Sequence, residues 1–371
     1  MPSNTAAWIT AKQAKPLVVK SAPYTPPREN EIVVKNGAVA INPVDWMLQV
    51  VGKYLFTWIK YPFILGGDLA GEVVEVGSGM SNFKVGDRVL GLAVGADPDR
   101  NNSAEAAFQL YSVVLTNMAS HIPRNLSYEQ AAVLPLTLAT AASGLFQKDF
   151  LALQFPTFPP QAPTGKTLLV WGGSTSVGSN AIQLAVAAGY EVFTTASPKN
   201  FDYVKKLGAS RAFDYKKKSV VQEVINAAKG KTMAGALAIG DGSLASCLDI
   251  MYHCKGEKFV ANISGPGGLP KGGINMLNLV PLMIGMMYWN ASTWIQSKRT
   301  GVRHKFVWGS GLRHNEVGDA IFGDFLPKAL EAQKYICAPE PQVVGKGLEH
   351  IQAGFELLKE GVSAKKVVVL L

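Results

Sequence analysis

Residues 168–178, Leu-Leu-Val-Trp-Gly-Gly-Ser-Thr-Ser-Val-Gly, constrain the fold of this chain more than any other stretch. An apolar run ends at Gly172-Gly173, and apolar residues then recur at helical spacing from Ala181 to Ala188. A strand, a glycine turn and a helix in this order bring backbone N–H groups and the positive end of a helix dipole to one point. A phosphate or pyrophosphate can bind there. Such a turn also occurs without a ligand, so other residues must decide whether a nucleotide binds.

The residues after this helix indicate which nucleotide the turn would hold. Residues 190–196 form a second short apolar strand, and its end lies about 20 residues past the glycines, where a dinucleotide fold contacts the adenosine ribose. NAD needs an acidic residue there, but this chain has Ser197-Pro198-Lys199-Asn200. Because lysine and serine hold a 2′-phosphate that a carboxylate would repel, the sequence predicts NADPH. Ser197 or Asn200 can equally cap the helix that follows.

The composition is typical of a globular enzyme with two domains. The 371 residues are 48% hydrophobic and 17% charged, with a formal net charge of +9. The cations are scattered apart from Lys216-Lys217-Lys218, which favours small anionic ligands over nucleic acid or membrane surfaces. Three cysteines and an N-terminus unlike a signal peptide predict a reducing, cytoplasmic location. The most apolar segment, 274–289, is short for a membrane span and is expected to be buried or to line a pocket.

Two patterns divide the chain. From about 166 to 263, apolar strands alternate with helical stretches, which predicts a doubly wound α/β domain with a parallel sheet. The expected strands of this sheet are 167–171, 191–196, 234–239 and 257–263. The first 120 residues show short alternating runs that end in turns, which predicts an antiparallel β barrel or sandwich. Prolines in 155–164 exclude a regular element there, and the tail is expected to add a helix near 347–359 and a strand at 366–371.

Several motifs resemble those of the medium-chain dehydrogenases/reductases. They are Ile41-Asn42-Pro43-Val44-Asp45, the runs Gly66–Gly77 and Lys84–Val89, the glycine turn, Asp214-Tyr215 and the stretch Lys346–Lys366. The resemblance covers nearly the whole chain and is strongest to the zinc-free quinone oxidoreductase and enoyl reductase branch, including fungal trans-acting enoyl reductases and toxD/cipB-like oxidoreductases. It implies a GroES-like β-barrel catalytic domain at 1–146 and 316–371, split around a Rossmann NADPH-binding domain at 147–315. The cofactor would lie in the cleft between them.

Metal-dependent relatives carry zinc ligands that this chain lacks. They have Gly-His-Glu where this chain has Gly66-Gly67-Asp68, and their catalytic cysteine has no counterpart before Cys247. The five histidines do not pair with cysteines at ligand spacing, and a structural zinc needs four soft ligands close together. We therefore expect no metal. Without a Lewis acid, hydride addition to an activated C=C is easier than reduction of a bare carbonyl, because hydrogen bonds can stabilise the enolate that forms.

The resemblance and the glycine turn together give the candidate site residues. The expected catalytic residues are Asp45, Tyr54 and Thr140. The expected cofactor-binding residues are Asn42, Gly172, Gly173, Ser174, Thr175, Ser176, Val177, Ser197, Lys199, Asn200 and Tyr215. Asn42 and Asp45 can instead fix a turn, and Tyr54 can be the wall of an apolar pocket. Trans-acting enoyl reductases have a lysine two positions after this Asp, but this chain has Met47, so that role does not transfer.

The expected function is NADPH-dependent reduction of the activated C=C of an enone, an enoyl thioester or a quinone. The expected substrate is bulky and apolar, because segments 46–61 and 274–294 are rich in aromatic residues and Met and would line a pocket. A carrier domain of a polyketide synthase is a further expected partner, and the chain is expected to be a monomer or homodimer. One-electron quinone reduction and a nonenzymatic, NADPH-binding regulatory role are the alternatives.

Overall fold

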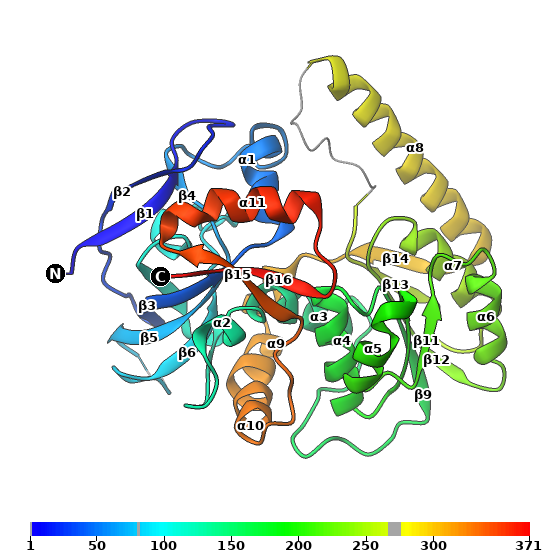
Figure 1. Ribbon diagram of the computed structural model, residues 1–371. Coiled ribbons are helices and arrows are strands. Elements are labelled where there is room, and N and C mark those ends of the chain that lie inside the picture. The colour runs from blue at the N-terminus through cyan, green and yellow to red at the C-terminus, as the bar shows by residue number, and fades with distance from the viewer. Residues whose placement is uncertain (1, 80–81, 266–275) are drawn as a thin grey trace. The chain divides into compact units, whose positions relative to one another are not determined.

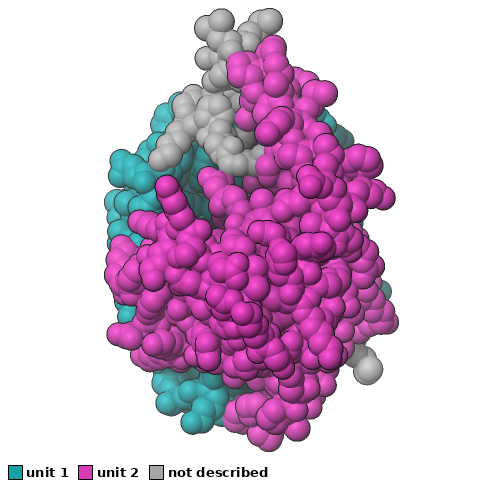
Figure 2. Space-filling model, turned by 90° about the vertical axis from the view of Figure 1, so that its right-hand side faces the viewer, with its two compact units in different colours: residues 1–136, 271–273, 318–371 teal, residues 137–270, 274–317 magenta. Residues whose placement is uncertain are grey.

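The computed structural model describes residues 2–79, 82–265 and 276–371 (Figure 1). These residues form two compact units, which have different colours in Figure 2. Unit 1 comprises the described residues up to Leu136 together with Gly318–Leu371, and unit 2 comprises those from Thr137 to Val317. The sequence places the divisions between a catalytic and an NADPH-binding domain at 146 and 316, and these domain bounds stay a prediction.

Unit 2 is built on a parallel sheet. Within the described residues its strand order is β11-β10-β9-β12-β13-β14, and each neighbouring pair is parallel. The strands are β9 (Lys166–Trp171), β10 (Glu191–Ala196), β11 (Arg211–Asp214), β12 (Thr232–Ala238), β13 (Phe259–Asn262) and β14 (Arg303–Phe306). Because β9 lies between β10 and β12, the winding direction reverses there. Open α/β sheets bind their ligands at the carboxyl ends of the strands at such a point.

Helices cover the sheet of unit 2 and close its core. They are α4 (Ser176–Ala187), α5 (Phe201–Lys206), α6 (Val220–Ala227), α7 (Ser243–His253) and α8 (Met276–Thr300), and α3 (Pro135–Phe146) leads into the unit. Leu169, Phe193 and Val260 of the sheet and Leu248 and Met251 of α7 belong to one fully buried cluster. The doubly wound α/β domain that the sequence predicts is therefore confirmed. The proline-rich stretch 155–164 contains neither helix nor strand.

Unit 2 also contains elements that the sequence did not predict. The strands β11 and β14 have only four residues each, which is too short to show a pattern. The segment 274–289 was expected to be buried or to line a pocket, and its first two residues lie outside the described residues. For Met283, Ile284 and Met287 the prediction is wrong, because these side chains are 54, 61 and 69% exposed on the outer face of α8. Among the described residues, no helix is long and apolar enough to cross a bilayer.

Unit 1 consists mainly of antiparallel strands. In the described residues one sheet has the order β15-β16-β3-β5-β6-β8, with β7 also paired to β3, and a smaller sheet has the order β2-β1-β4. The strands of the larger sheet are β3 (Glu31–Ala40), β5 (Asp68–Val76), β6 (Arg88–Leu92), β7 (Tyr111–Leu115), β8 (Ala119–His121), β15 (Glu340–Lys346) and β16 (Lys365–Leu370). Those of the smaller sheet are β1 (Asn4–Ile9), β2 (Val18–Ala22) and β4 (Phe63–Ile64). The β-rich first domain that the sequence predicts is confirmed.

The two ends of the chain meet in unit 1. β16 pairs antiparallel with β3, with Val368 opposite Ala40, and the N–H of Ile41 donates to the carbonyl of Val367 at 2.9 Å. The helices of this unit are α1 (Pro43–Leu55), α2 (Tyr128–Ala131), α10 (Leu326–Glu331) and α11 (Ile351–Glu360), and α9 (Glu316–Gly318) leads into it. This pairing places the start of α1 beside β16, where the polar cluster described below forms.

Candidate functional site

The glycine turn follows β9 and leads into α4. Gly172 has a φ of +86°, which glycine adopts readily and other residues rarely do. A side chain on Gly173 would place its Cβ 2.0 Å from Thr194 Oγ1. One on Gly178 would place its Cβ 2.2 Å from the carbonyl oxygen of Gly172. The turn needs glycine at Gly172 because of its positive φ, at Gly173 because the side chain of Thr194 leaves no room, and at Gly178 because the backbone of the turn lies against it.

Hydrogen bonds fix this turn on the neighbouring strand. The N–H groups of Gly172 and Gly173 donate to the hydroxyl and carbonyl oxygens of Thr195, each at 2.9 Å. Thr175 caps α4, since its hydroxyl oxygen accepts from the N–H of Gly178 at 3.0 Å and donates to the carbonyl of Gly172 at 2.7 Å.

The start of α4 presents donors to a ligand. The first N–H groups of a helix, here those of Ser176 and Val177, lie outside the helical hydrogen-bond ladder and carry the positive end of the dipole. Ser174, Ser176 and Val177 are partly accessible, and Thr175 is exposed. Hydrogen bonds fix this turn, its glycines leave the backbone uncovered, and the N–H donors of α4 follow directly. This arrangement fits the pyrophosphate of a dinucleotide.

The other cofactor candidates follow the carboxyl ends of β10 and β11. β10 lies between β9 and β11 in parallel register, so Ser197, Lys199 and Tyr215 emerge at the same edge of the sheet as the glycine turn. Lys199 is exposed and Tyr215 is 45% exposed, whereas the side chain of Asn200 is 9% exposed. The structure therefore brings the turn, Ser197, Lys199 and Tyr215 together, and Asn200 is directed into the unit.

Asn42 and Asp45 begin α1 and belong to a buried polar cluster. Asp45 Oδ2 accepts from the N–H of Asn42 at 2.7 Å, as the acidic residue of a capping box does. Asn42 Nδ2 donates to Asp68 Oδ2 at 2.8 Å, and Lys366 Nζ pairs with the same oxygen at 2.9 Å. Lys366 Nζ also donates to Asn42 Oδ1. All four side chains are buried, and Asp45 is 2% exposed.

Burial and the neighbouring charges together determine the protonation of Asp45. The ammonium group of Lys366 balances Asp68, whose Oδ1 also accepts from the N–H of Leu136 at 2.6 Å. Burial raises the pKa of Asp45 most, and the negative charge of Asp68 adds to the rise. The hydrogen bonds from Asn42 and the charge of Lys366 oppose it, and the pKa that results is about 7. Two carboxyl groups share one cation, so a protonated Asp45 leaves the cluster neutral.

Asp68 and Lys366 are members of the cluster that the sequence did not reveal. Asp68 is the first residue of β5 and Lys366 the second of β16, and both charged side chains are buried. A buried charged side chain requires a partner, so a charge in a strand that is expected to be buried indicates that such a partner exists. The identity of the partner was hidden because the two strands come from opposite ends of the chain.

Tyr54 and Thr140 lie in other elements. Tyr54 is half-buried in the last turn of α1, and Lys53 Nζ lies 4.6 Å from the centroid of its ring. Thr140 lies in α3 and is 9% exposed. Thr140 belongs to unit 2, whereas Asn42, Asp45 and Tyr54 belong to unit 1. The structure joins Asn42 and Asp45 in one cluster, and the roles of Tyr54 and Thr140 stay predictions.

Gly67 stands where zinc-dependent relatives carry a histidine. A Cβ there would lie 3.4 Å from Leu92 Cδ1 and 3.6 Å from the carbonyl oxygen of Ala93, so a side chain would make ordinary contacts. Next to it, Asp68 is already paired with Lys366. Across the described residues, no group of three His, Cys, Asp or Glu side chains is arranged to hold a metal ion.

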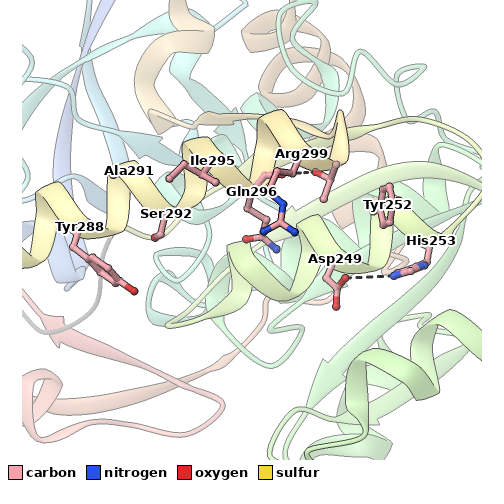
Figure 3. A pocket seen from close by; sticks show the side chains of 10 residues that line it. Asp249, Tyr252, His253, Tyr288, Ala291, Ser292, Ile295, Gln296 and Arg299 are labelled. Atoms are coloured by element: carbon pink, nitrogen blue, oxygen red, sulfur yellow. Dashed lines mark hydrogen bonds and ion pairs between the residues drawn. The ribbon is translucent and has the colours of Figure 1, made fainter.

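A groove in unit 2 lies away from the carboxyl ends of the strands. It has a volume of about 690 Å³ and runs between α7 and α8, where Tyr252, Tyr288, Ile295 and Arg299 line it (Figure 3). α7 follows β12 and runs back toward the amino ends of the parallel strands. Its last residues therefore lie at the opposite edge of the sheet from the glycine turn. The groove is separate from the candidate cofactor site.

Comparison with known proteins identifies the family. The alcohol dehydrogenase GroES-like domain matches residues 28–124, and the zinc-binding dehydrogenase family matches residues 176–261. The dehydrogenase pigH of Monascus ruber is 55% identical over 371 residues, which cover 100% of both chains. This chain is a medium-chain dehydrogenase/reductase. The resemblance seen in its motifs is thereby confirmed, together with the GroES-like and Rossmann-like fold.

Other relatives place this medium-chain dehydrogenase/reductase among the enoyl reductase-like members of the family. The trans-enoyl reductase himH of Aspergillus japonicus is 39% identical over 371 residues, covering 99% of this chain and 97% of the relative. The crystal structure of CurK enoyl reductase shares the fold, with a TM-score of 0.72 at 19% identity and coverage of 100% and 99%. The family consists of oxidoreductases that use a nicotinamide cofactor, in agreement with the glycine turn.

Proposed function

We propose that the protein is an NADPH-dependent reductase that adds hydride to the activated C=C of an enone, an enoyl thioester or a quinone, and that it does so without a metal. The cofactor part rests on the edge of the unit 2 sheet, where Ser197 and exposed Lys199 follow β10 at the place of the acidic residue of an NAD site. Lysine and serine bind a 2′-phosphate through charge-assisted hydrogen bonds.

Different residues would bind different parts of the cofactor. The glycine turn and the start of α4 would bind the pyrophosphate, Ser197 and Lys199 the 2′-phosphate, and Tyr215 would lie beside them. When bound, the cofactor supplies the hydride that adds to the β carbon of the substrate. Hydrogen-bond donors would stabilise the charge on the carbonyl oxygen, and the α carbon would take a proton from a side chain or from water.

The candidate catalytic residues have different parts in this proposal. Thr140 would orient the reacting groups, and Tyr54 would donate a proton or form the wall of an apolar pocket. Asp45 contacts Asn42 and is only 2% exposed, so it would act as a positioning residue through the start of α1. In the part of the chain that the structure describes, no three His, Cys, Asp or Glu side chains are arranged to hold a metal ion, which supports a reaction in which no ion polarises the carbonyl.

Relatives favour an enoyl substrate. One relative with 39% identity is called a trans-enoyl reductase, so a chain carried by a polyketide synthase domain is a proposed substrate. Met47 stands at the position where trans-acting enoyl reductases carry a lysine. Because that lysine is absent, an enone that no synthase domain carries is tested as a substrate beside the enoyl thioesters. We also propose a cytoplasmic location, where the free thiols of Cys247, Cys254 and Cys337 would stay reduced.

Isotope transfer tests the proposed reaction. The purified protein is incubated with NADPH that carries deuterium at the transferred position and with a panel of enones, enoyl thioesters and quinones. From enones and enoyl thioesters we expect the label on the β carbon, a solvent hydrogen on the α carbon and an intact C=O, and from quinones we expect the hydroquinone. An allylic alcohol would contradict the proposal and indicate carbonyl reduction. Semiquinone radicals would indicate one-electron chemistry, and NADPH binding without turnover would indicate a regulatory role.

A further inference from the structure

A buried serine of α4 connects the glycine turn to the next helix, α5. Ser179 is fully buried, and its hydroxyl donates to the carbonyl oxygen of Thr175 at 2.8 Å and to that of Gly173 at 3.3 Å. The phenol oxygen of Tyr203 lies 2.8 Å from the same serine oxygen. Tyr203 belongs to α5, which lies beside α4 in unit 2 (Figure 1). Side-chain hydroxyls therefore link α5 to the turn.

The acceptors set the direction of these hydrogen bonds. A carbonyl oxygen only accepts, so the single hydrogen of the Ser179 hydroxyl goes to a carbonyl, and the shorter contact is the one to Thr175. The oxygen of Ser179 is then an acceptor, and the phenol of Tyr203 donates to it. The chain of hydrogen bonds runs from Tyr203 through Ser179 to the carbonyl of Thr175.

This chain ends at the peptide group that begins α4. The carbonyl of Thr175 and the N–H of Ser176 belong to the same peptide group, and this carbonyl also accepts from the N–H of Ser179 at 2.8 Å. The N–H of Ser176 lies in the first turn of α4, outside the helical ladder, among the donors to the proposed pyrophosphate. Because hydrogen bonds in a chain polarise one another, a carbonyl that accepts two of them makes the N–H of its peptide group a stronger donor.

The packing of α5 does not need the phenol group of Tyr203. Val204 and Leu207 hold this helix on the unit, since they are 0 and 5% exposed. A phenylalanine would keep the aromatic ring at position 203, and only the hydroxyl reaches Ser179. Removing this hydroxyl therefore breaks the chain of hydrogen bonds and leaves the apolar contacts in place.

We propose that Tyr203 is a positioning residue for the cofactor, which acts through Ser179 to orient and strengthen the N–H of Ser176 as a donor to the pyrophosphate. The inference rests on the proposed cofactor site and adds to it a residue that acts through another side chain. NADPH and NADH carry the same pyrophosphate. Tyr203 therefore affects both cofactors alike, whereas Lys199 affects the one with a 2′-phosphate.

Binding of the two cofactors tests the role of Tyr203. In Tyr203→Phe we expect the dissociation constants of NADPH and of NADH, measured by calorimetric titration, to rise by the same factor of about 3–10. Tyr252→Phe removes an exposed phenol from the end of α7, at the opposite edge of the sheet, and should change neither constant. Wild-type affinities in Tyr203→Phe, or a loss confined to NADPH, would overturn the proposal.

A second substitution tests whether Tyr203 acts through Ser179. Ser179→Ala removes the hydroxyl between the phenol and the carbonyl, so adding Tyr203→Phe to this variant should cause no further loss of affinity. Losses that add would show that the two side chains act independently, which would overturn the relay. Because Ser179 is buried, the melting temperature of each variant is measured first, and affinities are compared well below the lowest of them.

The ligand-free protein provides a test that needs no cofactor. In NMR spectra of deuterated protein, the N–H proton of Ser176 should move to lower chemical shift in Tyr203→Phe, because its peptide group is less polarised. The N–H of Ala185, farther along α4, should hardly move. An unchanged Ser176 resonance would overturn the relay. A wild-type protein that binds neither NADPH nor NADH would instead overturn the proposed cofactor site, and with it the role of Tyr203.

Discussion

Among the single residues of the proposed site, Lys199 would decide the preference between NADPH and NADH. Its ammonium group is exposed at the end of β10, where only NADPH carries a phosphate. We expect Lys199→Ala to weaken NADPH binding by about 1.5–3 kcal/mol, roughly 10–100-fold, because it removes a charge-assisted hydrogen bond. NADH binding should hardly change, and fluorescence titration measures both.

A nearby lysine provides the control for this substitution. Lys206 is exposed at the end of α5 and contributes the same charge to unit 2. Lys206→Ala should therefore lower NADPH affinity only slightly. Equal losses for NADPH and NADH in Lys199→Ala would show that this lysine does not contact the 2′-phosphate.

Asp45 should make the stability of the protein depend on pH. Its pKa is raised by burial from 3.8 to about 7, so between these values the folded chain binds a proton that the unfolded chain has released. The free energy of unfolding should fall as pH rises from about 4 to about 7, by up to about 4 kcal/mol from this group. Urea denaturation of wild type and Asp45→Asn at pH 5 and pH 8 measures the difference.

The asparagine variant isolates this effect. Its amide oxygen can still accept from the N–H of Asn42, but it does not titrate. The free energy of unfolding of wild type should therefore rise relative to that of Asp45→Asn as the pH falls from 8 to 5. Asp241→Asn, at an exposed position, should run parallel to wild type. Parallel curves for Asp45→Asn as well would show that Asp45 is already ionised in the folded protein.

At the scale of the elements, the β9–α4 turn depends on glycine. A Cβ on Gly178 would lie 2.2 Å from a backbone oxygen and 2.7 Å from the Cα of Gly173, and backbone atoms cannot give way as the end of a side chain can. Gly178→Ala should abolish binding of the nicotinamide cofactor and lower the free energy of unfolding by more than about 2 kcal/mol. Calorimetric binding and urea denaturation measure the two effects.

A glycine in open space provides the matched control for Gly178→Ala. The Cβ of Gly323→Ala would meet nothing within 4 Å. That substitution should leave cofactor affinity unchanged and alter stability by about 1 kcal/mol or less. Full cofactor affinity in Gly178→Ala would contradict the role given to the turn.

Elements that depend on neighbouring residues were predictable from the sequence. The turn at 172–178 could be predicted because an apolar run, glycines and a helical pattern follow one another directly. The Asp68–Lys366 pair was not, because each charge is explained only by a strand from the other end of the chain. The exposed face of α8 could not be predicted either, because an apolar sequence does not tell which of two apolar helix faces meets the core.

At the scale of the whole molecule, the two units hold different parts of the proposed chemistry. Unit 2 carries the glycine turn, Ser197 and Lys199, and unit 1 carries the cluster around Asp45 and Lys366. Each unit has its own buried core, so changes in one unit need not unfold the other. Cofactor affinity and the pH dependence of stability therefore report on separate units.

The proposed reaction should proceed without a metal in the whole protein. The described residues contain no cluster of three metal-binding side chains, and Gly67 replaces the histidine of zinc-dependent relatives. Lys366 already supplies the positive charge beside Asp68. Turnover should persist after prolonged dialysis against a chelator, and elemental analysis should find far less than one zinc per chain. A zinc-dependent alcohol dehydrogenase treated in parallel should lose activity. One zinc per chain whose removal stops turnover would contradict the metal-free reaction.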